Sequence, residues 1–379
     1  MSMEIKDKEQ NIKGAADAKL LRVECNALRG LAIMGIMLHN FCHWLSPIVK
    51  ENEYQFIQQH IDWFDDVMSA PIGETPLEFF HIVSFFGHYG VPVFLFLSGY
   101  GLYLKYELPL KGQAEAIVPS AFRFVRYHWL KLFRMMIVGF VAFVLIDNIT
   151  AGAHKYDVMA IFGQMGLFNN LMEHPDKVIW PGPYWYFGLM FQCYIVYRLL
   201  LFRKHWSYAV AMIVVCTLIQ ALCEPEGETL NRVRYNFIGG MLPFCLGLLS
   251  ARYLNIKNWQ PYLSVFIASC VCVYLGSFYF YTWLFVPMFI CAAAISFVVF
   301  ISRTQKHFIP HRWIMKALNW IGTISAAMFV SHPIVRKILI PISREGNYWT
   351  GLLLYVICAI GVAWLFNELI KRVPSPKLK

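Results

Sequence analysis

Residues 27–39, ALRGLAIMGIMLH, decide how the rest of the chain is read. The stretch is almost entirely apolar, yet it carries a guanidinium at Arg29 and an imidazole at His39. A helix that crosses a bilayer needs about 20 mainly apolar residues. An ionisable group in hydrocarbon is costly, so such a residue marks a functional site by default. The stretch therefore predicts a membrane helix whose two ionisable residues have a task.

The composition of the whole chain points to the same class of protein. Of 379 residues, 58% are hydrophobic and only 15% are charged. Soluble domains are about half apolar and about a quarter charged, so this chain exceeds what a water-soluble fold would bury. The aromatic share of 17% suits helices with aromatic residues at both membrane interfaces. We expect an all-α polytopic membrane protein without an appended soluble domain.

Apolar segments of membrane-crossing length recur along the chain. The hydropathy pattern predicts about ten transmembrane helices. They lie near residues 28–48, 78–104, 131–150, 183–202, 207–223, 235–251, 261–278, 281–301, 318–341 and 349–370. The segment 156–172 is apolar but short, and the long loop 50–77 contains the pattern of a short amphipathic helix.

Basic residues occupy alternate loops, which sets the predicted orientation. Lys and Arg concentrate in the amino-terminal tail, in 105–134, in 303–316 and at the carboxyl end. By the positive-inside rule these segments face the cytoplasm, and so do both termini. The expected layout is a tail over 1–22, a transmembrane domain over 23–372 and a second tail over 373–379. The expected location is the inner, or cytoplasmic, membrane.

The net charge of +10 does not indicate nucleic acid as a partner. The basic residues are spread over the loops where topology would place them, and no Arg-rich or Lys-rich tract is present. The amino terminus also lacks the apolar core and small-residue cleavage site of a signal peptide. The expected partners are membrane lipids and substrates, and the sequence does not predict an oligomeric state.

Five stretches resemble motifs of the membrane-bound acyltransferase 3 family, which O-acylates cell-envelope glycans. The matches occur in the family's order, on a plan of about ten helices. They are NALRGLAIMGIMLHN (26–40), FFGHYGVPVFLFLSGYGLYL (85–104), RYHWLKLFRMM (126–136), PYWYFGLMFQCYIVYRLL (183–200) and LNWIGTISAAMFVSHPIV (318–335). The resemblance implies an integral-membrane acyltransferase that moves a short acyl group, acetyl or succinyl, from cytoplasmic acyl-CoA to a hydroxyl of a glycan or glycolipid.

Roles for individual residues follow from that resemblance and from side-chain chemistry. The resemblance implies that His39 is the general base, because an imidazole with a pKa near 6.5 can take a hydroxyl proton. Arg29, Lys131 and Arg134 are the candidate cradle for the phosphates of acetyl-CoA or succinyl-CoA, although basic residues also flank cytoplasmic helix ends for topological reasons. His332 either orients a substrate or breaks a helix beside a cavity.

The acceptor side has three further candidates. His43 lies one turn beyond His39 and shares its face, so it is a second candidate for contact with substrate. Trp185 and Tyr186 line the acceptor path in one interpretation and are ordinary interfacial aromatics in the other. Ser98, in LSGYG, lacks the surrounding pattern of a nucleophilic serine, so we expect it to serve helix packing.

The first motif departs from the family in one respect. Nine residues separate Arg29 from His39, where the family usually has ten. At about 100° per residue, the ten-residue step leaves the two side chains about 80° apart. Either a local bulge near Gly35 restores one face, or the pair is less coplanar here.

Two other functions fit parts of the pattern. A transporter or flippase for a lipid-linked glycan would explain the helices and the intramembrane charges, and would not need CoA. A metal site on His39 and His43 has chelating i, i+4 spacing, but we see no nearby carboxylate or cysteine set to complete it, so no metal is expected. Arg336 and Lys337 lie near the outer end of their helix, where they would snorkel or meet Asp147 or an anionic acceptor.

Overall fold

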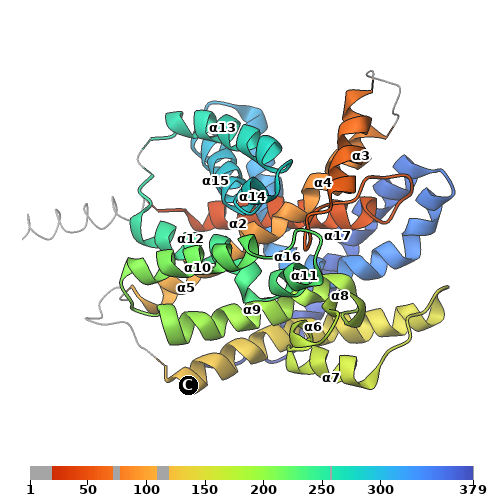
Figure 1. Ribbon diagram of the computed structural model, residues 1–379, viewed down its shortest axis with the longest axis horizontal. Coiled ribbons are helices and arrows are strands. Elements are labelled where there is room, and N and C mark those ends of the chain that lie inside the picture. The colour runs from red at the N-terminus through yellow and green to blue at the C-terminus, as the bar shows by residue number, and fades with distance from the viewer. Residues whose placement is uncertain (1–18, 71–76, 109–118, 257, 379) are drawn as a thin grey trace, which may run out of the picture. The chain divides into compact units, whose positions relative to one another are not determined.

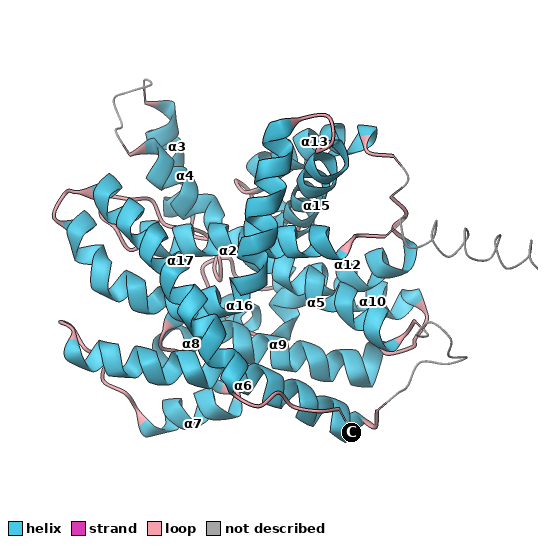
Figure 2. Cartoon of the chain, turned by 180° about the vertical axis from the view of Figure 1, so that it is seen from behind, coloured by secondary structure: helices cyan, strands magenta, loops and turns pink. Residues whose placement is uncertain are grey.

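A computed structural model describes residues 19–70, 77–108, 119–256 and 258–378. Every regular element in these ranges is a helix, and the described residues contain no strand (Figure 2). The main helices are α2 (Arg22–Cys42), α3 (Gln58–Ser69), α4 (Glu78–Phe86), α5 (Gly90–Tyr106), α6 (Ala121–Ile149), α9 (Trp185–Val196), α10 (Trp206–Ala221), α12 (Phe237–Tyr253), α13 (Gln260–Gly276), α15 (Val286–Thr304), α16 (Ile309–Arg344) and α17 (Tyr348–Arg372).

Short elements connect these helices. They are η1 (Gly87–Tyr89), α7 (Val158–Gly166), η2 (Asn169–Leu171), α8 (Pro175–Val178), η3 (Gly182–Tyr184), the π-turn η4 (Tyr197–Leu201), α11 (Glu228–Tyr235) and α14 (Phe280–Trp283). Figure 1 labels the short helices α7, α8, α11 and α14. The all-helical class predicted from the sequence is confirmed for the described residues.

Each of the ten segments predicted from hydropathy contains a helix. Five helical segments are long and apolar enough to cross a membrane: Glu78–Tyr106, Ala121–Ile149, Val286–Thr304, Ile309–Arg344 and Tyr348–Arg372. Three shorter apolar helices are α10, α12 and α13. The count of ten spans and the cytoplasmic placement of both termini stay predictions, as do the domain limits. Most of the predicted amino-terminal tail lies outside the described residues.

Several predicted boundaries were wrong for local reasons. The first helix ends at Cys42 rather than near residue 48, because Pro47 has no N–H to continue the ladder and disfavours helical backbone at Ser46. The third begins at Ala121 rather than near 131, because the Ser120 side chain accepts a hydrogen bond from the Arg123 N–H and caps the helix. The predicted amphipathic helix in the 50–77 loop is α3, which buries Ile61 and Phe64.

The chain divides into two compact units. The first comprises the described residues within 1–31, 92–116 and 243–323, and the second comprises the described residues within 32–91, 117–242 and 324–379. In the first unit α13 packs along α15, and a Cβ on Gly99 would lie 2.1 Å from the Phe244 carbonyl oxygen. The Ser98 hydroxyl donates to the Phe94 carbonyl of its own helix. Helix packing therefore accounts for this Ser-Gly pair, as expected.

In the second unit α6 is held on both sides. A Cβ on Gly139 would lie 2.2 Å from the Tyr184 hydroxyl oxygen and 2.5 Å from Val330 Cβ, so only glycine admits this close packing. Near the end of α6, the fully buried Asp147 pairs with Lys337 of α16 at 2.8 Å. Of the alternatives left open by the sequence for Arg336 and Lys337, contact with Asp147 is the one that the structure shows for Lys337.

Candidate active site

A cavity of about 220 Å³ lies within the second unit. Its wall is built from α2, the loop after it, η1, the start of α5, the 176–186 segment, the end of α11 and α16. The lining residues are Ile36, His39, Asn40, His43, Trp44, Glu51, Glu53, Tyr54, His88, Val91, Asp176, Ile179, Trp180, Gly182, Pro183, Trp185, Tyr186, Tyr235, Phe329 and Arg336. The volume is smaller than the 300–1,000 Å³ usual for drug-sized ligands, so it suits the reacting ends of substrates rather than a whole dinucleotide-sized molecule.

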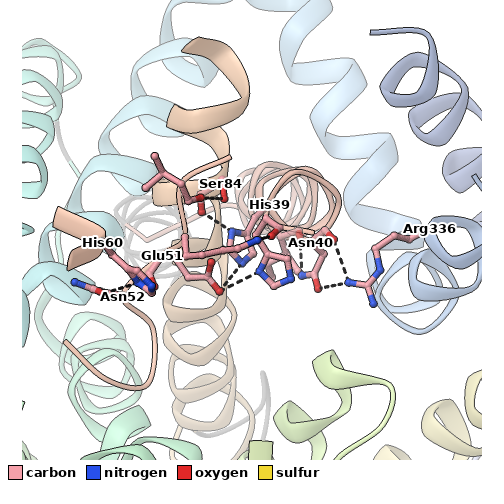
Figure 3. Close-up of polar contacts among 11 residues, drawn as sticks. His39, Asn40, Glu51, Asn52, His60, Ser84 and Arg336 are labelled. Atoms are coloured by element: carbon pink, nitrogen blue, oxygen red, sulfur yellow. Dashed lines mark hydrogen bonds and ion pairs between the residues drawn. The ribbon is translucent and has the colours of Figure 1, made fainter. Parts of the chain in front are cut away.

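His39 lies in this wall with a defined tautomer. Its side chain is buried, and its Nδ1 lies 2.7 Å from the Ser84 carbonyl oxygen of α4. A carbonyl only accepts hydrogen bonds, so the proton of a neutral ring sits on Nδ1 and Nε2 carries the lone pair. Nε2 lies 3.5 Å from Oε1 of Glu51 (Figure 3). Taking up a proton at Nε2 would therefore place the imidazolium against a carboxylate.

Glu51 is held in place by the segment around it. Its Oε1 accepts a hydrogen bond from His43 Nδ1 at 3.0 Å, so the imidazoles of His39 in α2 and of His43 just after it face one oxygen. Its backbone carbonyl accepts from His60 Nδ1 at 2.9 Å. Lys50 also donates to the His43 carbonyl. The other oxygen, Oε2, is buried and has no hydrogen-bond partner among the described residues.

The two carboxyl groups of this loop differ in protonation. Burial alone would raise the pKa of Glu51, but the His43 and His39 imidazoles hold it well below its ordinary value. Burial raises the pKa of Glu53 to about 7, against the pull of His39 and with a contribution from the Glu51 charge. Near neutral pH, Glu51 is therefore ionised, whereas Glu53 is protonated in part of the molecules and ionised in the rest.

Aromatic rings also line the cavity. Tyr54 stacks on Tyr235 with ring centroids 3.9 Å apart and meets Trp185 edge to face at 5.4 Å. Trp44 and Trp180 meet at 6.3 Å in a T-shaped pair. Broad apolar faces beside a few polar groups are typical of small-molecule sites.

Arg336 of α16 also lines the cavity. Its Nη1 donates to the carbonyl and to the side-chain oxygen of Asn40 at 3.0 and 3.3 Å (Figure 3). Its guanidinium also lies 5.2 Å from the centre of the Trp44 ring. These contacts join α16 to the carboxyl end of α2.

The structure brings together four of the residues selected from the sequence. His39, His43, Trp185 and Tyr186 all line the cavity. His332 is fully buried but is not a lining residue. Its Nδ1 bonds to the Met328 carbonyl of its own helix at 3.0 Å, and its Nε2 has no partner in the described part of the chain.

The three basic candidates for the donor site do not line the cavity. Arg134 donates to the Ile370 carbonyl at the end of α17 and to Ser375 Oγ, so it caps that helix. Lys131 is exposed on α6. Arg29 belongs to the first unit, where its Nη1 donates to Asn26 Oδ1 at 2.8 Å. Their role in holding CoA stays a prediction.

The backbone of α2 settles the question of the shorter spacing. The helix is α-helical without interruption from Arg22 to Cys42. A bulge near Gly35 is therefore not present, and the step from Arg29 to His39 leaves the two side chains about 80° apart.

One inference from the sequence was wrong at this site. We saw no carboxylate that would complete a set with His39 and His43, but Glu51 does so. One ligand atom from each of the three lies within 4.8 Å of the others. The loop after α2 folds back and brings Glu51 to His43. The two residues are eight positions apart in the sequence, and that spacing alone does not predict the contact.

Glu53 and His88 are two further cavity residues that were missed for similar reasons. Glu53, like Glu51, reads as an ordinary acidic residue of an outer loop. His88 lies inside the stretch 85–104, FFGHYGVPVFLFLSGYGLYL, whose resemblance to the family rests on its glycines and its SGY triplet. His88 could have been selected from the sequence because it is a histidine in an apolar run, and ionisable residues at such positions mark function.

Comparison with known proteins identifies the chain's family. The sequence profile described as an acyltransferase domain, acyltransferase 3, matches residues 22–368. No curated protein and no solved structure gives a significant match. The matched range contains the whole cavity and nearly all of the described helices. This chain is a member of the acyltransferase 3 family.

Proposed function

We propose that the protein is an integral-membrane O-acyltransferase that moves a short acyl group, acetyl or succinyl, from cytoplasmic acyl-CoA to a hydroxyl of an envelope glycan or glycolipid. The observation that carries the proposal is the environment of His39. Its Nδ1 bonds to the Ser84 carbonyl, its Nε2 is left to act as a base, and Glu51 stands 3.5 Å from that atom. Family membership supplies acyl transfer as the class of reaction.

The chemistry follows from the weakness of a hydroxyl as a nucleophile. His39 Nε2 takes the hydroxyl proton as the oxygen attacks the thioester carbonyl. The imidazolium that forms is stabilised by Glu51, which His43 holds in place. When the carbon–sulfur bond breaks, the proton passes to the departing thiolate. The products are the ester and free CoA thiol, and His39 returns to its neutral form.

The wall of the cavity supports a sugar as the acceptor. The faces of Trp44, Trp180 and Trp185 offer apolar surface for the C–H face of a pyranose ring. Oε2 of Glu51, which has no hydrogen-bond partner in the part of the chain that the structure describes, offers an acceptor for a sugar hydroxyl. The cavity admits only the reacting ends of both substrates, so the rest of the CoA and the glycan would extend outside it.

The proposed location is a cytoplasmic membrane. Five described helices are long and apolar enough to cross one. Basic residues concentrate in alternate loops, which supports a cytoplasmic position for those loops and therefore a cytoplasmic source of the acyl donor. Arg29, Lys131 and Arg134 remain the proposed contacts for the CoA phosphates at that face.

The test measures acyl release from radiolabelled acetyl-CoA or succinyl-CoA by the full chain in nanodiscs. We expect the wild type to release or transfer the acyl group and His39→Ala to lose activity by on the order of 10²- to 10⁴-fold, the usual contribution of a general base. His307→Ala removes an exposed histidine outside the cavity and serves as the matched control.

Two outcomes contradict the proposal. If His39→Ala, folded and monodisperse, retains wild-type activity, His39 is not the base. If the wild type is folded yet inert with each acyl-CoA donor, acyl transfer from CoA is wrong, and translocation of a lipid-linked glycan becomes the function to assay.

A further inference from the structure

A break in the second long helical segment places a further imidazole in the cavity. Between α4 and α5 the backbone tightens into the short turn η1, Gly87–Tyr89. Such 3₁₀ turns inside a long helix often mark functional positions. His88 is the central residue of this turn, and it lines the cavity.

Two glycines flanking His88 press the turn against α2. A Cβ on Gly87 would lie 2.5 Å from Cβ of His39, and a Cβ on Gly90 would lie 2.3 Å from the Ala32 carbonyl oxygen. No larger residue fits either position without moving the backbone. The close approach brings the His88 ring centroid within 5.6 Å of the His39 centroid.

The ring nitrogens of His88 make no hydrogen bond of full geometry within the described residues. The residue is only 6% exposed, neither Nδ1 nor Nε2 meets the distance and angle of a hydrogen bond there, and the Phe85 backbone, one turn earlier, makes only a weak polar contact with the ring. Leaving a buried polar group unpaired costs roughly 1–3 kcal/mol. The ring packs on Tyr89 with centroids 3.9 Å apart. A buried imidazole that lines a cavity and makes no well-formed hydrogen bond to the described residues is suited to meet a ligand.

We propose that His88 is a second catalytic residue, whose ring N–H donates to the acyl carbonyl oxygen as that oxygen becomes an oxyanion. The inference rests on the proposed acyl transfer. As the hydroxyl oxygen bonds to the carbonyl carbon, the π pair of the C=O moves onto its oxygen, where the His88 N–H holds it. The pair returns as the carbon–sulfur bond breaks, and His88 neither gains nor loses a proton overall.

The groups around His39 and His88 explain why the first would act as the base and the second as the hydrogen-bond donor. His39 has a carboxylate against Nε2 and a carbonyl on Nδ1, which suits a base that becomes charged. His88 takes part in no ion pair among the described residues. A neutral imidazole carries one N–H donor, and donors aimed at a developing oxyanion are strong contributors to catalysis.

The experiment compares His88→Leu, which removes the N–H, with His88→Gln, which keeps one. We expect His88→Leu to lower kcat by on the order of 10²-fold with little change in KM for either substrate, and His88→Gln to recover part of that loss. His128→Gln is the matched control, because His128 is buried among aromatic rings of α6 but does not line the cavity. Its kcat should stay within about threefold of wild type, well short of the loss from one oxyanion donor.

An infrared measurement tests the same contact without turnover. With ¹³C-labelled acetyl-CoA and no acceptor, the carbonyl stretch of the bound donor should lie lower in the wild type than in His88→Gln or His88→Leu. This reading stands even if one variant is too unstable for kinetics, because the remaining variant supplies the comparison.

The outcomes separate this inference from the proposed function. An inert wild type refutes acyl transfer itself. An active wild type that depends on His39, together with a His88→Leu variant of unchanged kcat and unchanged carbonyl stretch, refutes only the role of His88. A raised KM for the acceptor at constant kcat also overturns it, since His88 would then bind the acceptor rather than the oxyanion.

Discussion

At the scale of the residue, the chemistry of His39 depends on groups that are distant in the chain. Ser84 fixes the ring through its carbonyl, and Glu51 supplies the opposing charge. Metal-free proton transfer and metal binding would use the same atoms, because His39, His43 and Glu51 converge within 4.8 Å. Substitution of single residues and removal of metal distinguish proton transfer by these residues from metal binding.

Replacing Glu51 by Gln should lower kcat by on the order of 10²-fold, because the imidazolium of His39 loses its stabilising charge in the transition state. KM for acyl-CoA should change little, since the cavity is too small to hold most of that molecule. Steady-state kinetics of acyl transfer measure both. Glu51→Asp is the companion variant, and it should keep more activity than Glu51→Gln. Equal kcat for wild type and Glu51→Gln would show that the carboxylate has no part in the proton transfer.

Removing divalent metals should leave activity unchanged, because the proposed base uses the free lone pair of His39 Nε2. The measurement is transfer activity after dialysis against a chelator, with elemental analysis of the protein. A loss that zinc restores would instead make His39, His43 and Glu51 metal ligands, a set that resembles catalytic zinc sites with an open position.

Replacing Glu53 by Gln should stabilise the protein above neutral pH. Burial raises the pKa of Glu53 to about 7 from its ordinary 4.5. The folded state therefore keeps a proton that the unfolded state has lost, and this contribution to stability disappears as the pH rises through about 7. A neutral Gln avoids the loss, so Tm should rise by roughly 2–4 °C at pH 8 and by less at pH 5. Asp66→Asn, on the exposed face of α3, is the control. A gain in Tm that is the same at both pH values would contradict the assignment.

At the scale of the element, close helix contacts put the imidazoles side by side. Glycines at 87 and 90 allow the η1 turn to meet α2, and the turn itself orients His88 toward the cavity. The loop after α2 then folds back, and contacts such as that between Ser84 Oγ and the Val49 carbonyl at 2.5 Å tie it to α4. Packing at these contacts decides the position of the base.

Replacing Gly87 by Ala should destabilise the protein by about 1–3 kcal/mol and reduce activity, because the new methyl group would overlap Cβ of His39. Thermal unfolding in nanodiscs and the transfer assay measure the two effects. Gly101→Ala is the matched control on α5, where no atom lies within 4 Å of an added Cβ. That change should be neutral or slightly stabilising, as expected for Ala in a helix. Equal effects of the two substitutions would argue against close packing at Gly87.

At the scale of the whole molecule, topology connects the site to its substrates. The alternation of basic loops predicts that both termini face the cytoplasm, where acyl-CoA is made. The cavity residues of the 50–57 loop would then belong to the outer side of the membrane.

Reporter fusions test this orientation. A reporter active only in the cytoplasm should work at the carboxyl terminus, after Lys379, and should fail when inserted at Gly227, in a loop predicted to lie outside. A reporter active only outside should give the reverse pattern. Activity of the same reporter at both positions would rule out the predicted arrangement of the helices.

Much of the molecule was determined by the sequence itself. Hydropathy determined that the chain is helical and where its long helices run, because apolar runs of bilayer length have few other folded solutions. The motif around Arg29 and His39 pointed to the family, and His39, His43, Trp185 and Tyr186 proved to line one cavity. Each of these features is local, so it is visible in a short window of residues.

Tertiary structure decided the rest. Glu51 came to His39 through a loop that reverses direction, and His88 came to it through close packing of two helices at glycines. Arg134 proved to cap α17, and His332 proved to bond within its own helix rather than line the cavity. Periodicity along one helix says which residues share a face, but not which other helix or loop meets that face. The identity of the neighbours, and with it the chemistry of the buried imidazoles, exists only in the folded chain.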